Sequence, residues 1–150
     1  MTEAFFSYRR QLMDAVKAGN EEALMKLGIG IVATAKPLAP VDFGQLRNSI
    51  QWKTAKSQGG FEAGHAEIGK RGRKWTGEET SHQLTDKPED NVLLVGATAR
   101  HAIYQEYGTA RNRPHPFLRP AIEKYVKGNV VKNTIKNAMD EWLNRKLKQK

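Results

Sequence analysis

The first third of the chain has the spacing of apolar residues that is typical of an amphipathic α-helix. Residues 3–18 predict one helix, and Asn20 can cap a second helix that follows directly. Gly19 between them can be either a break or only a kink, because glycine is a weak helix former. We expect Pro37 and Pro40 to end the helical run, since a proline nitrogen cannot donate a hydrogen bond to the helix.

The middle of the chain changes to patterns that are typical of β-strands. Over residues 48–54 an isoleucine and a tryptophan alternate with polar residues, which predicts a strand with one buried face. A second strand is expected over residues 60–68, after a turn through residues 57–59. The continuous apolar run 92–95 predicts a third strand that is buried on both faces.

Residues 69–90 separate the last two of these strands and hold many charges but few apolar positions. A stretch of this length without regular structure is typical of a functional or disordered loop, and we expect a flexible loop here. Its first part combines four cations with an aromatic ring, so it can contact DNA phosphates or a partner protein. The alternative is a mobile surface loop, since acidic residues at 78–90 nearly balance the cations. The residues concerned are Lys70, Arg71, Arg73, Lys74 and Trp75.

The last third of the chain predicts helices again. A short helix around residues 99–107 is expected to end at Gly108, and another is expected to begin near Phe117. A basic helix over residues 129–150 carries its apolar residues on one stripe. The order of helix, strands and helices indicates an α+β fold, in which a small antiparallel sheet packs against a long N-terminal helix and the C-terminal helices. We expect residues 1–150 to form a single domain.

Composition and charge narrow the classes of function. The formal net charge is +9, and residues 101–150 contribute +7 of it. Such a segment can steer a protein toward nucleic acid or an acidic surface, or it can be the solvated end of a lysine-rich helix. The absence of cysteine excludes disulfides, thiolate catalysis and cysteine-bound zinc. No apolar stretch is long enough to span a membrane and no signal-peptide pattern is present, so we expect no membrane partner and synthesis in the cytoplasm.

Catalytic chemistry is not indicated by the sequence. The four histidines do not pair with other residues at the spacing of metal ligands. Ser49 and Ser81 lack the glycine pattern of a nucleophile elbow, and the glycines form neither a phosphate-binding loop nor a dinucleotide fingerprint. We therefore expect no catalytic residues, no metal site and no cofactor, and we interpret the chain as a non-enzyme.

Two segments contain dense and unusual combinations of residues. The first, residues 35–50, includes the turn Pro40-Val41-Asp42-Phe43-Gly44. In such a turn proline fixes φ, the aspartate can accept hydrogen bonds from backbone amides two residues on, and glycine can take a positive φ. The second consists of Tyr104-Gln105-Glu106-Tyr107-Gly108-Thr109 and, further on, Pro116-Phe117-Leu118-Arg119-Pro120-Ala121.

Together these segments resemble the head–tail joining (neck) or tail-completion family of long-tailed bacteriophages, over roughly residues 20–126. The resemblance implies a structural virion protein, made in the host bacterium, that acts at the neck or the tail end. It also implies a homo-oligomeric ring, expected to be hexameric on assembly, that docks to connector or head-completion proteins and to tail-tube proteins. Genomic DNA would pass through its centre. The threonine that this family shows before the glycine is Phe43 here, which removes a hydroxyl group from the turn.

The two segments supply the residues expected to form turns, core positions and subunit contacts. Arg47 and Glu106 both flank glycine turns that are expected near the same end of the sheet. We therefore expect their side chains to form an ion pair. A basic nucleic-acid-binding module, driven by the C-terminal charge, is the alternative function. The expected turn and contact residues are Pro40, Asp42, Gly44, Leu46, Arg47, Tyr104, Glu106, Gly108, Thr109, Pro116, Phe117, Leu118, Arg119 and Pro120.

Overall fold

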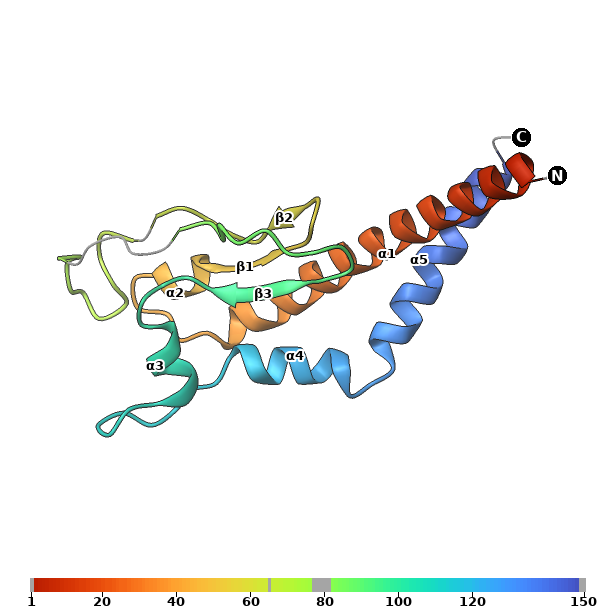
Figure 1. The fold of residues 1–150 in the computed structure, drawn as a ribbon. Coiled ribbons are helices and arrows are strands. Elements are labelled where there is room, and N and C mark those ends of the chain that lie inside the picture. Colours follow the sequence, from red (N-terminus) through yellow and green to blue (C-terminus); the bar gives the residue numbers. More distant parts are fainter. Residues whose placement is uncertain (1, 65, 77–81, 149–150) are drawn as a thin grey trace.

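The computed structural model describes residues 2–64, 66–76 and 82–148, and these residues form the predicted α+β fold (Figure 1). A small antiparallel sheet packs against one long N-terminal helix, and the C-terminal helices pack against the same helix. The elements in chain order are α1 (Thr2–Leu38), α2 (Gln45–Asn48), β1 (Ile50–Lys53), β2 (Gln58–Gly59), β3 (Leu94–Ala97), α3 (Ala102–Tyr107), α4 (Leu118–Val126) and α5 (Val130–Leu147).

The helix α1 continues through Gly19, which excludes the break that the sequence left open and confirms the long N-terminal helix. Asn20 does not cap a second helix; its side-chain amide donates to Asn91 Oδ1 at 3.1 Å. Gly19 lies beside α5, where a Cβ atom would be 3.4 Å from Cγ of Met139, an ordinary van der Waals contact. The helix ends between Pro37 and Pro40, as the two prolines predict.

The sheet has the strand order β2-β1-β3, with both pairs antiparallel. The predicted second strand over residues 60–68 is wrong, since β2 consists of two residues inside the segment expected to be a turn. Gly60 and Gly64 have φ values of +90° and +96°, which interrupt the extended backbone. The turn lies earlier, where the N–H of Thr54 donates to the carbonyl of Ser57 at 2.7 Å.

Both faces of β1 are covered, whereas its alternating pattern predicts one buried face. Gln51 is only 3% exposed. Its side-chain amide donates to the carbonyl of His82 at 2.8 Å and accepts from the N–H of Leu84 at 2.9 Å, so residues 82–84 lie over the sheet. The strand β3 begins two residues later than the apolar run 92–95 and is half-buried, not buried on both faces.

The sheet and α4 approach α1 closely at two glycines. A Cβ atom at Gly28 would lie 2.7 Å from Cγ of Trp52, and one at Gly30 would lie 2.5 Å from the hydroxyl oxygen of Tyr125. The core between these layers consists of Ile31, Val32, Ala35, Ala39, Leu46, Ile50, Trp52, Ala99, Ala102, Phe117 and Ala121. The helix α5 runs back along the N-terminal half of α1, so α2, α3 and their loops lie at the opposite end of the molecule (Figure 1).

We expect the Gly28→Ala substitution to destabilise the protein. A methyl group would collide with the buried ring of Trp52 and cost roughly 1–3 kcal/mol, which exceeds the gain of about 1 kcal/mol in helix propensity. Gly96→Ala is the matched control, because a Cβ atom there meets nothing within 4 Å. Urea unfolding checks the prediction, and equal midpoints for the two variants would contradict it.

Candidate functional site

The turn at residues 40–44 leads from α1 into α2. Gly44 has a φ of +86°, as the turn chemistry predicts. Leu46 is buried in the core, as expected, and Arg47 is exposed. The predicted role of Asp42 is wrong: one of its carboxylate oxygens pairs with Arg73, and the other is buried without a hydrogen-bond partner. The turn therefore uses its aspartate to hold a distant loop.

That loop, residues 66–75, folds back onto the turn as a small hairpin. The N–H of Ala66 donates to the carbonyl of Phe43 at 2.8 Å, and Ile68 bridges Lys74 in antiparallel fashion. Gly69 is buried at the contact, where a Cβ atom would lie 2.5 Å from a carboxylate oxygen of Asp42 and 3.0 Å from the Phe43 ring. Only glycine allows this approach without a shift.

Phe43 of the turn packs against the aromatic residue of the loop. The rings of Phe43 and Trp75 meet edge to face, with centroids 5.1 Å apart and an interplanar angle of 74°. Such aromatic pairs contribute about 0.5–1.5 kcal/mol beyond the area that they bury. The turn thus holds the basic loop by an aromatic contact as well as by the Asp42–Arg73 ion pair.

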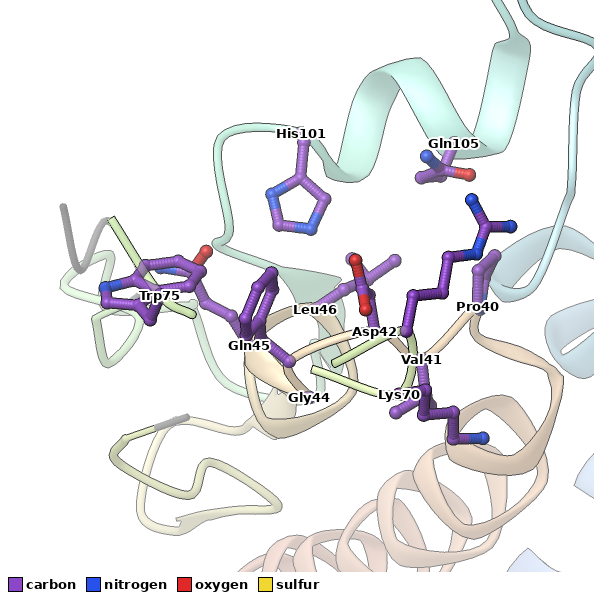
Figure 2. Close-up of a pocket in the computed structure, with 12 residues that line it drawn as sticks. Pro40, Val41, Asp42, Gly44, Gln45, Leu46, Lys70, Trp75, His101 and Gln105 are labelled. Carbon is purple, nitrogen blue, oxygen red and sulfur yellow. The ribbon is translucent and has the colours of Figure 1, made fainter. Parts of the chain in front are cut away.

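A cavity of about 600 Å³ lies between the turn, the basic loop and the start of α3 (Figure 2). The loop contributes Lys70 and Arg71 to its lining, and α3 and its N-terminal neighbour contribute Gln105 and His101. Burial lowers the pKa of His101 below its ordinary value of 6.5, so its ring is neutral near pH 7. The lining of the cavity therefore combines the cations Lys70 and Arg71 with the carboxylate of Asp42 and with uncharged hydrogen-bonding groups.

Glu106 is a buried carboxylate that holds the start of α4. It is 7% exposed and accepts hydrogen bonds from the backbone N–H groups of Phe117 (2.8 Å), Leu118 (3.0 Å) and Arg119 (2.9 Å). Burial alone raises the pKa of Glu106, but these three amides and the charge of Arg119 outweigh it and leave the pKa below the ordinary 4.5. The first amides of a helix lack partners within the helix, and Glu106 supplies one from α3.

The predicted ion pair between Arg47 and Glu106 is wrong. Both carboxylate oxygens of Glu106 accept from backbone amides, and the charge that acts on Glu106 is that of Arg119. The charge of Arg47 acts on Glu62 instead. Arg119 also lies over the ring of Tyr107, 5.3 Å from its centroid, so its side chain joins α4 to α3.

Residues 108–116 form a closed loop between α3 and α4. Gly108 has a φ of +77° and ends α3, as predicted, and a Cβ atom there would lie 2.9 Å from the carbonyl oxygen of Asn112. Thr109 pairs with Asn112 across the loop, and Phe117, which follows Pro116, is fully buried as a core residue. The loop is therefore fixed at both of its ends.

A second cavity, of about 450 Å³, lies on the other side of α3. It is bordered by β3, α3 and α4, and its lining includes Ile103 and Tyr107. Ile103 is 60% exposed, Tyr104 55% and Tyr107 67%. The helix α3 thus separates two concave surfaces and presents apolar side chains to solvent beside one of them.

The structure brings together residues that the sequence predicts separately. The turn at 40–44 and the cations at 70–74 meet in one place, and the segments 104–109 and 116–121 meet through Glu106. Sequence reasoning missed Gln105, which lines the first cavity. It also missed Gln51, whose polar side chain in a strand pattern gives no sign of burial.

The described residues contain no group of three or more histidine, aspartate or glutamate side chains that could hold a metal ion. Within the same part of the chain, no helix is long and apolar enough to cross a membrane. The site instead combines exposed aromatic and apolar side chains with cations, and such a combination is typical of surfaces that bind other macromolecules. The fold therefore gathers, at one end, residue types that are typical of binding surfaces.

The chain belongs to the HK97 gp10-like family, whose model is described as "Bacteriophage HK97-gp10, putative tail-component" and matches residues 7–108. This range includes the turn at 40–44 and the basic loop, and it ends at Gly108, before the segment 116–121. Neither the curated proteins nor the solved structures give a significant match. Family membership makes this protein a structural component related to the phage tail, as the resemblance of its motifs predicts.

We expect Glu106→Gln to destabilise the protein by roughly 1–3 kcal/mol at pH 7, since a neutral amide is a weaker acceptor for the three amides. The folded-state pKa of Glu106 is depressed, so its contribution is present above the unfolded pKa near 4.5 and is lost as pH falls through the folded pKa. The variant should therefore show a weaker loss of stability below pH 4.5 than the wild type.

Thermal unfolding between pH 3 and pH 7 measures this difference. Glu123→Gln is the control, because Glu123 also has a lowered pKa but lies on the surface beside Lys127 and should change stability little. Identical acid profiles for the wild type and the Glu106→Gln variant would contradict the assigned role.

Proposed function

We propose that this protein is a subunit of a ring, hexameric on assembly, at the head–tail junction or the tail end of a long-tailed phage. The ring docks to connector or head-completion proteins on one side and to tail-tube proteins on the other, and genomic DNA passes through it. Membership of a phage tail-component family and the resemblance of residues 35–50 and 104–121 to neck and tail-completion proteins support this proposal.

The observation that carries the proposal is the exposed apolar face of α3. Ile103, Tyr104 and Tyr107 lie on one six-residue helix, and each is more than half exposed. Isolated exposed apolar residues are ordinary, but a cluster beside a cavity is typical of a protein-binding surface, and tyrosine is enriched in such surfaces. We assign this face to the contact with a neighbouring subunit.

The two sides of α3 differ, which fits a ring better than a two-fold dimer. One side faces the cavity with Lys70, Arg71 and Gln105, and the other side faces the more apolar cavity with Ile103 and Tyr107. When one surface of a subunit meets a different surface of the next, the contact is heterologous. Repeating such a contact gives a closed ring if the rotation from subunit to subunit returns to the first one. In this proposal the chain 1–150 acts as one domain. The loop expected to be flexible over residues 69–90 includes residues 77–81, which lie outside the described part of the chain, whereas residues 69–75 form the hairpin on the turn and residues 82–84 lie over the sheet.

A basic nucleic-acid-binding module is the alternative function, and the charge of residues 101–150 favours it. One cation of that segment is used within the fold, because Arg145 of α5 pairs with Glu22 of α1. This pair and the pair of Glu141 with Lys26 help α5 to pack on α1, so the C-terminal helix has a structural role that is compatible with assembly.

We expect Ile103→Ser to fold normally and to prevent ring formation and head–tail joining. Ile29→Ser is the matched control, since Ile29 is also a helical isoleucine and is 52% exposed. Analytical ultracentrifugation measures the ring, and complementation of a phage that lacks the gene measures joining, with thermal unfolding as the test of folding. We expect at least roughly a tenfold loss of infectious particles for Ile103→Ser alone. Equal yields for the two variants would contradict the assignment of this face.

A further inference from the structure

The loop between α3 and α4 presents two arginines on a backbone that is held at several points. The backbones of Thr109 and Asn112 exchange hydrogen bonds of 2.9 and 3.3 Å. The hydroxyl oxygen of Thr109 also accepts from the N–H groups of Arg111 (3.3 Å) and Asn112 (3.1 Å). At the base, the N–H of His115 donates to the carbonyl of Gln105 at 2.7 Å. Arg111 and Arg113 therefore extend from a tip with a defined shape.

The charges of these two arginines are available to a ligand. Both residues are exposed, and neither guanidinium forms an ion pair within the described part of the chain. Residues 107–116 contain no acidic side chain, and both oxygens of the nearby Glu106 accept from α4 amides. Nothing described on this loop neutralises the two positive charges.

Several cations elsewhere on the protein already have carboxylate partners. They hold α5 on α1, tie α1 to the segment after β2, join the turn at 40–44 to the basic loop, or stabilise a single helix. These paired cations are Lys26, Lys36, Arg73, Lys127 and Arg145. Arg111 and Arg113 differ from them in having no such carboxylate partner among the described residues.

Lys70 and Arg71 lie at the same end of the molecule as the arginine loop (residues 108–116). They line the first cavity together with Gln105, and the carbonyl of Gln105 holds His115 at the base of the arginine loop. In Figure 1 both loops project from the end that is opposite to α5 and the first turns of α1. Two cationic loops thus flank α3.

We propose that Arg111 and Arg113, together with Lys70 and Arg71, bind the phosphodiester backbone of duplex DNA without sequence preference. Residues 109–113 carry no large apolar side chain, whereas a protein-binding surface needs an apolar centre. Spaced, exposed cations suffice for a polyanion, and a guanidinium can bond two phosphate oxygens at once. The choice of duplex DNA rests on the proposed ring, because that ring places DNA along its axis.

The salt dependence of DNA binding tests this site. Fluorescence anisotropy measures the affinity of the full chain for a random-sequence 25-base-pair duplex between 50 and 200 mM NaCl. Each lost phosphate contact reduces the magnitude of the negative slope of log K against log salt by about 0.9, so we expect Arg111→Gln/Arg113→Gln to reduce that magnitude by about 1.8 and to lower the affinity more than tenfold. The matched control is Lys132→Gln/Lys136→Gln on α5, which removes the same charge from exposed residues and should leave the slope unchanged.

A charge-conserving variant separates charge from folding. Arg111→Lys/Arg113→Lys should keep the wild-type slope, because lysine also neutralises a phosphate. The proposal is overturned if the wild type does not bind duplex DNA, if the glutamine variant keeps the wild-type slope, or if the lysine variant loses as much slope as the glutamine variant. Equal losses in the α5 control would also overturn it.

Phage assembly is scored separately, so the two proposals can fail independently. If the glutamine variant prevents ring formation while the wild type does not bind DNA, the loop contacts an acidic protein surface and the DNA site is wrong. If DNA binding behaves as expected while Ile103→Ser assembles normally, the DNA site stands and the α3 contact fails.

Discussion

The fold depends on the close approach of three layers to one helix. Gly28 and Gly30 lie on α1 where the sheet and α4 leave no room for a Cβ atom, and Gly19 lies on α1 beside α5. Each glycine weakens an isolated helix by about 1 kcal/mol, so α1 owes its stability to the layers that pack on it and not to local propensity. Because Trp52 lies over Gly28, the position of α1 fixes the sheet, and the sheet in turn positions the turn at 40–44 and α3.

The second constraint is the carboxylate of Glu106, which joins two segments that are separate in the sequence. Its three backbone hydrogen bonds fix the start of α4 relative to α3 and close the loop between them. The exposed face of α3 and the arginines of the loop both depend on this arrangement. A buried carboxylate that faces only backbone amides is thus a structural group here, although a buried acid can also indicate acid–base chemistry.

Sequence reasoning identified the α+β class and most helices, because helical periodicity, prolines and the glycine at 108 are local signals. It failed where tertiary contacts determine the local structure or the burial of a residue. The pattern around Gly19 left a break or a kink open, and the structure shows a continuous helix; Gln51 has the position of an exposed strand residue, yet residues 82–84 cover it. Glu106 was identified as a residue of interest, but its partners are backbone amides, which no pattern of side chains reveals.

The candidate site was predictable as separate motifs and not as an arrangement. The turn chemistry indicated Gly44, and the density of charge indicated Lys70 and Arg71, but their meeting at one cavity depends on the Asp42–Arg73 pair and on the buried Gly69. The arginine loop had no signal of its own in the sequence. Its importance comes from the hydrogen bonds that fix the backbone and from the absence, among the described residues, of a carboxylate beside it.

The central proposal is that this protein works as a structural part of a tailed phage particle, at the head–tail junction or the tail end. Electron microscopy of lysates from a phage that lacks the gene tests it most directly, with the gene supplied in trans as the control. The account predicts separate heads together with unjoined or incomplete tails, and joined particles when the gene is restored. Normal, joined virions in the absence of the gene would contradict it.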